Sequence, residues 1–215
     1  MVRTNTAAWN RVRYTLYAPF YDLFVRYLDR GRRRALQLLD VRPGERVLLV
    51  GCGTGLDLDH LPAGAEVTAI DYTPAMVERT RARARALGRP VTAEVMDAQR
   101  LDLPDGSFDC VALHLILAVV PDAEACAREA ARVLRPGGRA SVFDKFLPDD
   151  ARPSVLRSAA NLVMGTLATE INRRLGPLLR AGGLELVRRE PSLLGGTFQV
   201  ALARKPGHPP SRGGT

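Results

Sequence analysis

Hydrophobic and polar positions divide the middle of the chain into short apolar runs separated by amphipathic stretches. The apolar runs have the length and composition of buried strands, and five strands are predicted at residues 46–50, 66–70, 91–95, 108–113 and 139–143. Helices are predicted between them at residues 55–61, 74–87 and 122–134, with Thr73 and Asp122 as N-caps and Arg135-Pro136-Gly137-Gly138 ending the last helix. Strands that alternate with helices indicate an α/β fold with a parallel sheet covered on both faces.

The order of elements changes beyond residue 145. A helical region at about residues 154–180 is followed by two predicted strands, 184–190 and 197–204, with no helix between them. A hairpin-like end of the sheet is therefore expected. Residues 205–215 are rich in glycine and proline and are expected to form a flexible tail.

Aromatic residues gather near the N-terminus. Tyr14, Tyr17, Tyr21 and Phe24 recur at three- and four-residue spacing, which predicts one face of a helix that Pro19 bends or restarts. Three interpretations stay open: a helix packed on the core, a lid over a pocket, and an amphipathic element at a membrane surface. The number of hydroxylated aromatic side chains favours the lid.

Composition and charge narrow the class of protein. Hydrophobic residues make up 46 % of the 215 residues, enough for one substantial core, and neither a membrane-spanning run nor a signal peptide is visible. The three cysteines match no metal or disulfide spacing, so a cytoplasmic location is expected. The net charge of +8 is concentrated in residues 1–46, which contain ten arginines against four carboxylates. That region can meet phospholipid headgroups or nucleic acid, or it can be a solvated helix face.

The most informative segment is VGCGTG, where the strand at residues 46–50 runs into Gly51, Gly53 and Gly55. Glycines at alternate positions let a ligand approach the backbone, whose amides can bind polar groups. The dinucleotide pattern requires a glycine where Leu56 stands, and no Gly-Lys-Ser/Thr follows, so NAD, FAD and a P-loop are disfavoured.

Two carboxylates follow the next two predicted strands. Asp71 ends the second strand, 20 residues after Gly51, where it can accept hydrogen bonds from ribose hydroxyls. Asp97, followed by Ala98 and Gln99, comes just after the third strand and can accept the exocyclic amine of adenine. A helix cap and a plain turn are the alternative interpretations. Together with the glycines, the two carboxylates predict one adenosine pocket at the carboxyl edge of the sheet.

Four segments, taken in order, resemble the class I S-adenosylmethionine-dependent methyltransferases: VGCGTG, AIDYTPAMVERTRARA, MDAQRLDLPDGSFDCV and the helix ending in RVLRPGG. The resemblance covers about residues 46–143. It implies a Rossmann-like, mostly parallel seven-stranded sheet with an antiparallel last strand. It also implies S-adenosylmethionine as cofactor and S-adenosylhomocysteine as product. The expected organisation is an N-terminal helical lid (1–45), a cofactor-binding domain (46–204) and the tail (205–215).

The resemblance also implies the cofactor contacts. These are Gly51, Cys52, Gly53 and Gly55 at the methionine end, Asp71 at the ribose, Tyr72 and Met76 around the adenosine, and Asp97 and Ala98 at the adenine. His114 and Leu115 are expected beside the sulfonium and the acceptor, and Tyr17 of the aromatic helix is expected to contact the cofactor. One position departs from the family, because many members have Asp or Glu where this chain has Leu49. That departure leaves open a non-methylating member of the fold that binds S-adenosylmethionine or a related ligand.

The acceptor is constrained by a looser similarity. Tyr17-Ala-Pro-Phe-Tyr21-Asp22 followed by GRRRALQLL resembles the entry to bacterial phosphatidylethanolamine N-methyltransferase-like and quinone C-methyltransferase-like proteins, in which an aromatic helix closes over the cofactor. A small molecule or lipid headgroup is therefore expected as substrate, with an amine nitrogen first and a quinone carbon as the alternative. The sequence LHLILAVVPD after the fourth strand and the lack of an RNA-binding module disfavour nucleic acid.

The catalytic candidates follow from the chemistry of methyl transfer. The enzyme must align nucleophile, methyl and sulfur, and a base is needed only when the acceptor loses a proton. His114 is the candidate base or orienting group, with a hydrogen-bonded histidine in the pocket wall as the alternative, and Tyr21 lines the acceptor side. No carboxylate cluster is placed, so no metal is expected.

Overall fold

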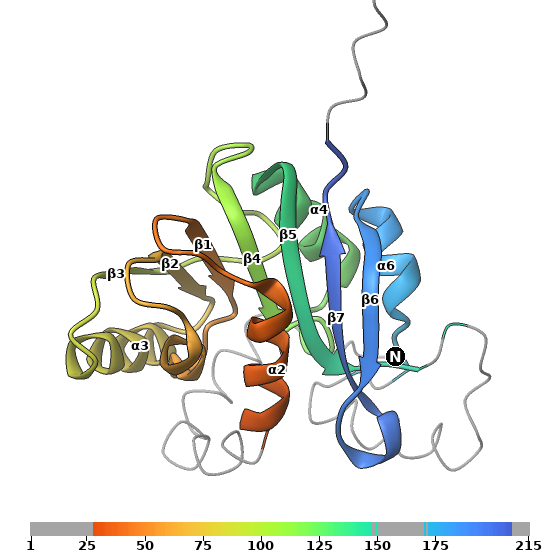
Figure 1. Ribbon diagram of the computed structural model, residues 1–215, viewed down its shortest axis with the longest axis horizontal. Helices are drawn as coiled ribbons and strands as arrows, with labels where there is room; N and C mark the ends of the chain where they lie inside the picture. Colours follow the sequence, from red (N-terminus) through yellow and green to blue (C-terminus); the bar gives the residue numbers. More distant parts are fainter. Residues whose placement is uncertain (1–27, 148, 150–169, 171, 208–215) are drawn as a thin grey trace, which may run out of the picture.

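The computed structural model describes residues 28–147, 149, 170 and 172–207. Seven strands form one sheet in the order β3-β2-β1-β4-β5-β7-β6 (Figure 1). Their bounds are β1 Arg46–Val50, β2 Glu66–Asp71, β3 Val91–Val95, β4 Phe108–His114, β5 Leu134–Lys145, β6 Glu185–Pro191 and β7 Phe198–Arg204. Strands β1 to β5 pair in parallel, and β7 pairs antiparallel with both β5 and β6. The predicted class I sheet with an antiparallel last strand is confirmed.

Helices cover both faces of the sheet. The helical elements are α2 Asp29–Leu39, η1 Leu56–His60, α3 Pro74–Ala86, α4 Ala123–Val133, α6 Leu175–Ala181 and η2 Leu194–Gly196. Alternate side chains of β1 show the two layers, because Leu48 and Val50 pack with α4 and α6 while Val47 and Leu49 pack with α2 and α3. This alternation is expected of a strand that is buried on both faces.

Helix α2 lies unusually close to the sheet. Gly31 faces the ring of Phe143 in β5, and a Cβ atom at position 31 would overlap that ring. In Figure 1 α2 lies across the sheet beside β4, β5 and β7. The helix is therefore part of the packed core on one face, and the backbone of residue 31 sets its distance from the sheet.

Three local predictions need correction. The helix predicted at residues 55–61 is the shorter 3-10 helix η1. Strand β5 begins at Leu134 and not at residue 139, because the backbones of Gly137 and Gly138 pair with Lys205 and extend the ladder. Thr73 occupies the N-cap position of α3, but its side chain makes no capping bond. Asp122 does cap α4, since its carboxylate accepts the Ala125 N–H at 2.8 Å.

Several predictions fall outside the described residues. They concern the aromatic N-terminal helix with Tyr17 and Tyr21, the helical region before residue 170, and most of the tail. The division into lid, domain and tail therefore stays a prediction. Within the described part of the chain, no helix combines the length and hydropathy that crossing a bilayer requires.

The topology places ligand chemistry at one edge of the sheet. From β1 the chain continues outward to β2 and β3, and it then returns to place β4 on the other side of β1. The strand order therefore reverses between β1 and β4. Open α/β sheets bind ligands at the carboxyl ends of such strands.

Candidate active site

One cavity lies at this reversal point. It is formed by the ends of β1, β2 and β4 and the segments that follow β3 and β4. It is lined by Gly51, Gly53, Ile70, Asp71, Tyr72, Thr73, Met76, Met96, Asp97, Ala98, Gln99, Leu115, Ile116, Val119, Val120 and Pro121. Seven residues predicted from the sequence are among them: Gly51, Gly53, Asp71, Tyr72, Met76, Asp97 and Ala98. Both predicted carboxylates thus line a single cavity.

The glycine loop brings bare backbone to the cavity wall. Gly51 and Gly53 have φ angles of 67° and 57°, in the left-handed region that favours glycine. A Cβ on Gly51 would come within 2.8 Å of the Ile116 side chain. The absence of a side chain at position 51 therefore lets Ile116 pack directly against the loop backbone beside the cavity.

Cys52 and Gly55 support the loop from behind and do not line the cavity. Thr80 donates hydrogen bonds to the Cys52 sulfur at 3.3 Å and to the Gly53 carbonyl at 2.9 Å. Burial raises the pKa of the Cys52 thiol, so the thiol stays protonated and unreactive. Gly55 begins η1 with a φ angle of 79°.

Asp71 combines fixed backbone contacts with spare acceptor capacity. Its Oδ2 accepts the Gly53 N–H at 3.0 Å and its Oδ1 accepts the Thr73 N–H at 2.9 Å. Each carboxylate oxygen can accept a second hydrogen bond, so two acceptor positions remain for a ligand. Burial raises the pKa of Asp71 above its ordinary value, and the two N–H bonds act in the opposite direction.

Asp97 is held by its neighbour. Its Oδ1 accepts both the backbone N–H and the side-chain amide of Gln99 at 2.9 Å, and the Gln99 Oε1 accepts the Asp122 N–H at 2.9 Å. These bonds fix the carboxylate at the cavity wall and engage only Oδ1. The second oxygen can therefore accept from a ligand amine.

The cavity is polar at one side and apolar at the other. Tyr72 is 36 % exposed at the rim, whereas Met76 is buried beneath it. The apolar side comes from the segment 115–121 after β4, most of which the sequence analysis did not assign. This segment is fixed from behind by Asp144, whose Oδ2 accepts the Ala118 N–H at 2.8 Å.

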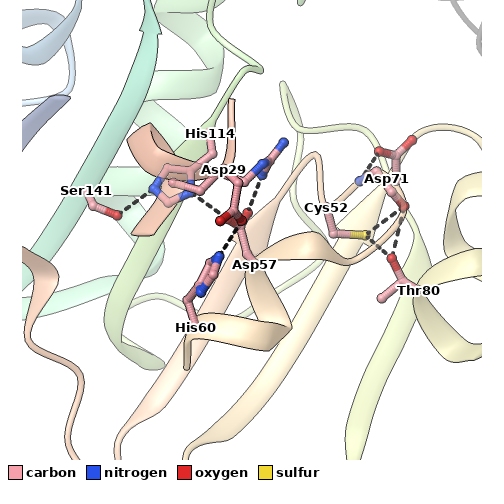
Figure 2. A network of polar contacts seen from close by, with 10 residues as sticks. Asp29, Cys52, Asp57, His60, Asp71, Thr80, His114 and Ser141 are labelled. Atoms are coloured by element: carbon pink, nitrogen blue, oxygen red, sulfur yellow. Dashed lines mark hydrogen bonds and ion pairs between the residues drawn. The ribbon is translucent and has the colours of Figure 1, made fainter. Parts of the chain in front are cut away.

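His114 does not line the cavity. It is 3 % exposed, and both ring nitrogens have partners. Nδ1 lies 2.9 Å from Asp57 Oδ1, and Nε2 lies 2.9 Å from Ser141 Oγ. Figure 2 shows the ring between these two residues, apart from the group formed by Cys52, Thr80 and Asp71.

Asp57 joins this network to α2. Its Oδ2 accepts from Nη1 of Arg32 at 3.0 Å, and both side chains are buried. A second polar contact also joins α2 to η1: Oδ1 of Asp29 in α2 lies 2.6 Å from Nε2 of His60 in η1 (Figure 2). Burial alone would raise the pKa of Asp57, but the charges and hydrogen bonds of Arg32 and His114 lower it well below its ordinary value.

Sequence reasoning missed Arg32, Asp57 and Ser141. In the segment LDLDH, Asp57 and Asp59 flank Leu58, and nothing local distinguishes the buried carboxylate from the exposed one. The segment that follows β4 carries another unusual feature. Leu115 has a φ angle of 59°, which is rare for a leucine, and non-glycine residues in this region are often found at functional sites.

The residues present suit an adenosine-containing sulfonium cofactor. Two carboxylates with free acceptor positions can meet ribose hydroxyls and an amine, and glycine backbone lines the cavity beside Asp71. The segment 115–121 supplies an apolar surface between the cavity and the adjacent helix α4. The fold and the cavity together define an α/β protein with a nucleoside-type ligand site at the switch point of its sheet.

Comparison with known proteins agrees with this class. A methyltransferase domain family matches residues 48–142. A phosphatidylethanolamine N-methyltransferase of Cereibacter sphaeroides is 32 % identical over 187 residues, which cover 86 % of this chain and 92 % of the relative. A demethylmenaquinone methyltransferase of Thermus thermophilus is 38 % identical over 135 residues, which cover 59 % of this chain and 61 % of that relative.

Solved structures share the fold. Geranyl diphosphate C-methyltransferase from Streptomyces coelicolor, in complex with Mg²⁺, geranyl diphosphate and S-adenosyl-L-homocysteine, is similar with a TM-score of 0.70 at 19 % identity; the similarity covers 84 % of this chain and 81 % of that one. The chain belongs to the class I S-adenosylmethionine-dependent methyltransferase family. Its cofactor is S-adenosylmethionine.

Proposed function

We propose that this methyltransferase binds the adenosine part of its cofactor between Asp71 and Asp97 and transfers the methyl group to an amine nitrogen of a lipid headgroup. The main support for this binding mode is that both carboxylates line one cavity and have oxygen lone pairs available to a ligand. In this proposal Asp71 accepts from the ribose, Asp97 and Ala98 meet the adenine, and Tyr72 and Met76 pack around the nucleoside. The loop from Gly51 to Gly55 faces the methionine end, with Cys52 contributing through its backbone.

When bound, the cofactor supplies an electrophilic methyl group on a sulfonium. The residues of this chain have to orient the donor and the acceptor and exclude water. The apolar side chains of Ile116, Val119 and Val120 suit water exclusion, because they line the cavity and are mostly or partly buried. An amine acceptor attacks through its neutral lone pair and must lose a proton, which passes to a base or to solvent. The proposals that His114 is that base, and that Tyr17 and Tyr21 line the cofactor and the acceptor, stay predictions.

The amine acceptor is supported by the extent of similarity to one relative. The phosphatidylethanolamine N-methyltransferase aligns along nearly its whole length, including regions outside the methyltransferase domain match. Regions outside the cofactor core usually determine the acceptor, since the fold itself hosts many reactions. The concentration of arginines in residues 1–46 suits a phosphate-bearing surface. Contact with a membrane through the N-terminal segment is part of this proposal.

The test is methyl transfer from isotopically labelled S-adenosylmethionine to vesicles. Vesicles of phosphatidylethanolamine should yield labelled mono-, di- or trimethylated lipid by mass spectrometry. Vesicles of phosphatidylcholine, which has no proton-bearing amine, serve as the control and should stay unlabelled. An unlabelled phosphatidylethanolamine in a preparation that binds S-adenosylhomocysteine would refute the acceptor and leave the cofactor site intact.

A second candidate acceptor is a quinone carbon. It is favoured by the 38 % identity to a demethylmenaquinone methyltransferase, although this match spans only about three fifths of either chain. The same assay with a demethylated quinone in detergent decides between the two. Label in the quinone and none in the lipid would establish the second candidate.

A further inference from the structure

The partners of His114 indicate which of its two ring nitrogens donates a hydrogen bond and which accepts one. Asp57 is ionised because it pairs with the buried guanidinium of Arg32, which lowers its pKa, and an ionised carboxylate only accepts. Nδ1 of His114 must therefore carry the proton in the 2.9 Å bond to Asp57. In the neutral ring Nε2 then accepts from the Ser141 hydroxyl, also at 2.9 Å. The order of groups is the Asp-His-Ser order of hydrolytic enzymes.

Burial excludes the nucleophilic use of this arrangement. Ser141 lies inside β5 with no exposed surface, and neither it nor His114 is among the residues that line the cavity. A substrate carbonyl has no route to the Ser141 oxygen. A methyl acceptor in the cavity has the same difficulty with Nε2 of His114, because Ser141 occupies that nitrogen.

The residue that connects the network to the cavity is Leu115. It follows His114 directly, lines the cavity, and has the positive φ angle of 59°. Its N–H donates to the Phe143 carbonyl of β5 at 2.7 Å. A leucine holds this conformation only when its surroundings fix it. The neighbouring side chain, His114, is fixed from two sides by Asp57 and Ser141.

The network also reaches α2, which lies within residues 1–45, the stretch predicted as the lid. Arg32 belongs to α2, and its buried guanidinium binds the same carboxylate that holds His114. Asp57 is thus the junction between α2 and the end of β4. A change at this junction is transmitted to the cavity wall through one buried carboxylate and one imidazole ring.

We propose that Asp57 and Ser141 are positioning residues for methyl transfer: they hold His114 in one tautomer and orientation, and through it they fix the Leu115 backbone that closes the cofactor cavity at the end of β4. This inference rests on the proposed cofactor site. It assigns His114 a positioning role in place of a base, and it extends the site to Arg32 on α2.

Three variants test the proposal. Asp57→Asn removes the charge at the junction and should weaken S-adenosylhomocysteine binding and lower kcat, each by about 10-fold or more, because small displacements in a preorganised site have large effects. Ser141→Ala should also weaken S-adenosylhomocysteine binding and lower kcat, but by smaller factors than Asp57→Asn does. Asp59→Asn is the matched control, since Asp59 lies on η1, pairs with Arg83 near the surface and does not touch His114, and it should leave both unchanged.

His114→Asn separates positioning from base catalysis. The asparagine amide can replace Nδ1–H in the bond to Asp57, so the proposal predicts that much of the cofactor affinity and kcat is retained. Loss of a general base would instead lower kcat by about 10²–10⁴-fold with unchanged cofactor affinity and would remove an ionisation from the pH–rate profile. That second result would overturn the proposal.

Nuclear magnetic resonance of the imidazole nitrogens provides a readout that a purely structural role would not move. The wild-type protein should show a protonated Nδ1 on His114, and Asp57→Asn should change this signal while the protein stays folded. An Nε2–H tautomer in the wild type would overturn the proposal. Unchanged S-adenosylhomocysteine affinity in folded Asp57→Asn and Ser141→Ala would overturn it too, whereas failure of the wild type to bind would refute the cofactor site itself.

Discussion

Two carboxylates near the glycine loop have opposite environments: Asp71, which binds the loop at Gly53, and Asp57, which follows the loop in η1. Asp71 accepts two backbone N–H groups and keeps acceptor positions toward a cavity. Asp57 is enclosed, and a guanidinium and an imidazole occupy one oxygen each. The pKa of Asp71 is raised and that of Asp57 is lowered.

The comparison shows how a carboxylate that can bind a ligand differs from one that only holds neighbouring side chains in place. Both are buried enough to feel a low dielectric, but among the residues that the structure describes only Asp57 has a cation in contact with it. Asp57 has one partner on each oxygen, as Asp71 does, but it is enclosed and does not line the cavity, so a ligand cannot reach its remaining acceptor positions. A carboxylate that accepts only neutral backbone donors remains under-stabilised, and ligand hydroxyl groups can complete its hydrogen bonding.

The largest expected effect is on stability, at Asp57. Asp57→Ala leaves the Arg32 charge buried and unpaired, and the free energy of unfolding should fall by about 3–5 kcal/mol in urea titrations. Asp59→Ala on the same 3-10 helix breaks only the half-exposed pair with Arg83 and should cost less than about 1 kcal/mol. Equal losses in the two variants would contradict the distinction between the two carboxylates.

An intermediate effect is expected on binding, at Asp71. Asp71→Ala removes the acceptors proposed for the ribose and should weaken S-adenosylhomocysteine binding by about 1–3 kcal/mol, roughly 5- to 150-fold, in isothermal titration calorimetry. Asp102→Ala, an exposed carboxylate outside the cavity, is the control and should bind as the wild type does. An unchanged dissociation constant in folded Asp71→Ala would remove the ribose assignment.

The smallest expected effect is on pH dependence, and its sign differs between the two sites. The contribution of Asp57 is present at neutral pH and is lost as the pH falls below its unfolded value of about 3.9, toward the lowered folded pKa. Ionised Asp71 carries an unfavourable contribution that disappears as the pH falls through its raised pKa.

Unfolding free energies between pH 7 and pH 3 test these signs. The advantage of the wild type over Asp57→Asn should begin to fall below about pH 4. Over the interval just above pH 4 the wild type should gain stability relative to Asp71→Asn. Drifts of the same sign for both variants would show that the environments of the two carboxylates do not differ in the way proposed.

Local sequence predicted most of the fold and one side of the site. The glycine loop, Asp71 and Asp97 each directly follow a strand, and the carboxyl ends of parallel strands meet at one edge, so their convergence follows from the strand pattern. Asp122 as a helix cap depends only on residues three apart. Each of these features depends on residues that are close together in the sequence, so a single sequence reveals it.

The remaining features depend on contacts between distant segments. Arg32, Asp57, His114 and Ser141 come from four elements, and the periodicity around Asp57 gives no sign of burial. Residues 136–138 read locally as a turn, yet pairing with Lys205 makes Gly137 and Gly138 part of a strand. In both cases tertiary partners override the local preference, and a single sequence does not reveal them.

The close approach of Gly31 to Phe143 has a consequence for how related enzymes can diversify. A side chain at position 31 would require either the Phe143 ring or α2 to move, and a shift of α2 would disturb the contact between Arg32 and Asp57. The helix is therefore tied to the sheet both by close packing and by a buried ion pair. Differences in acceptor among related enzymes are accordingly expected in the connections that flank this frame, where changes leave the cofactor cavity intact.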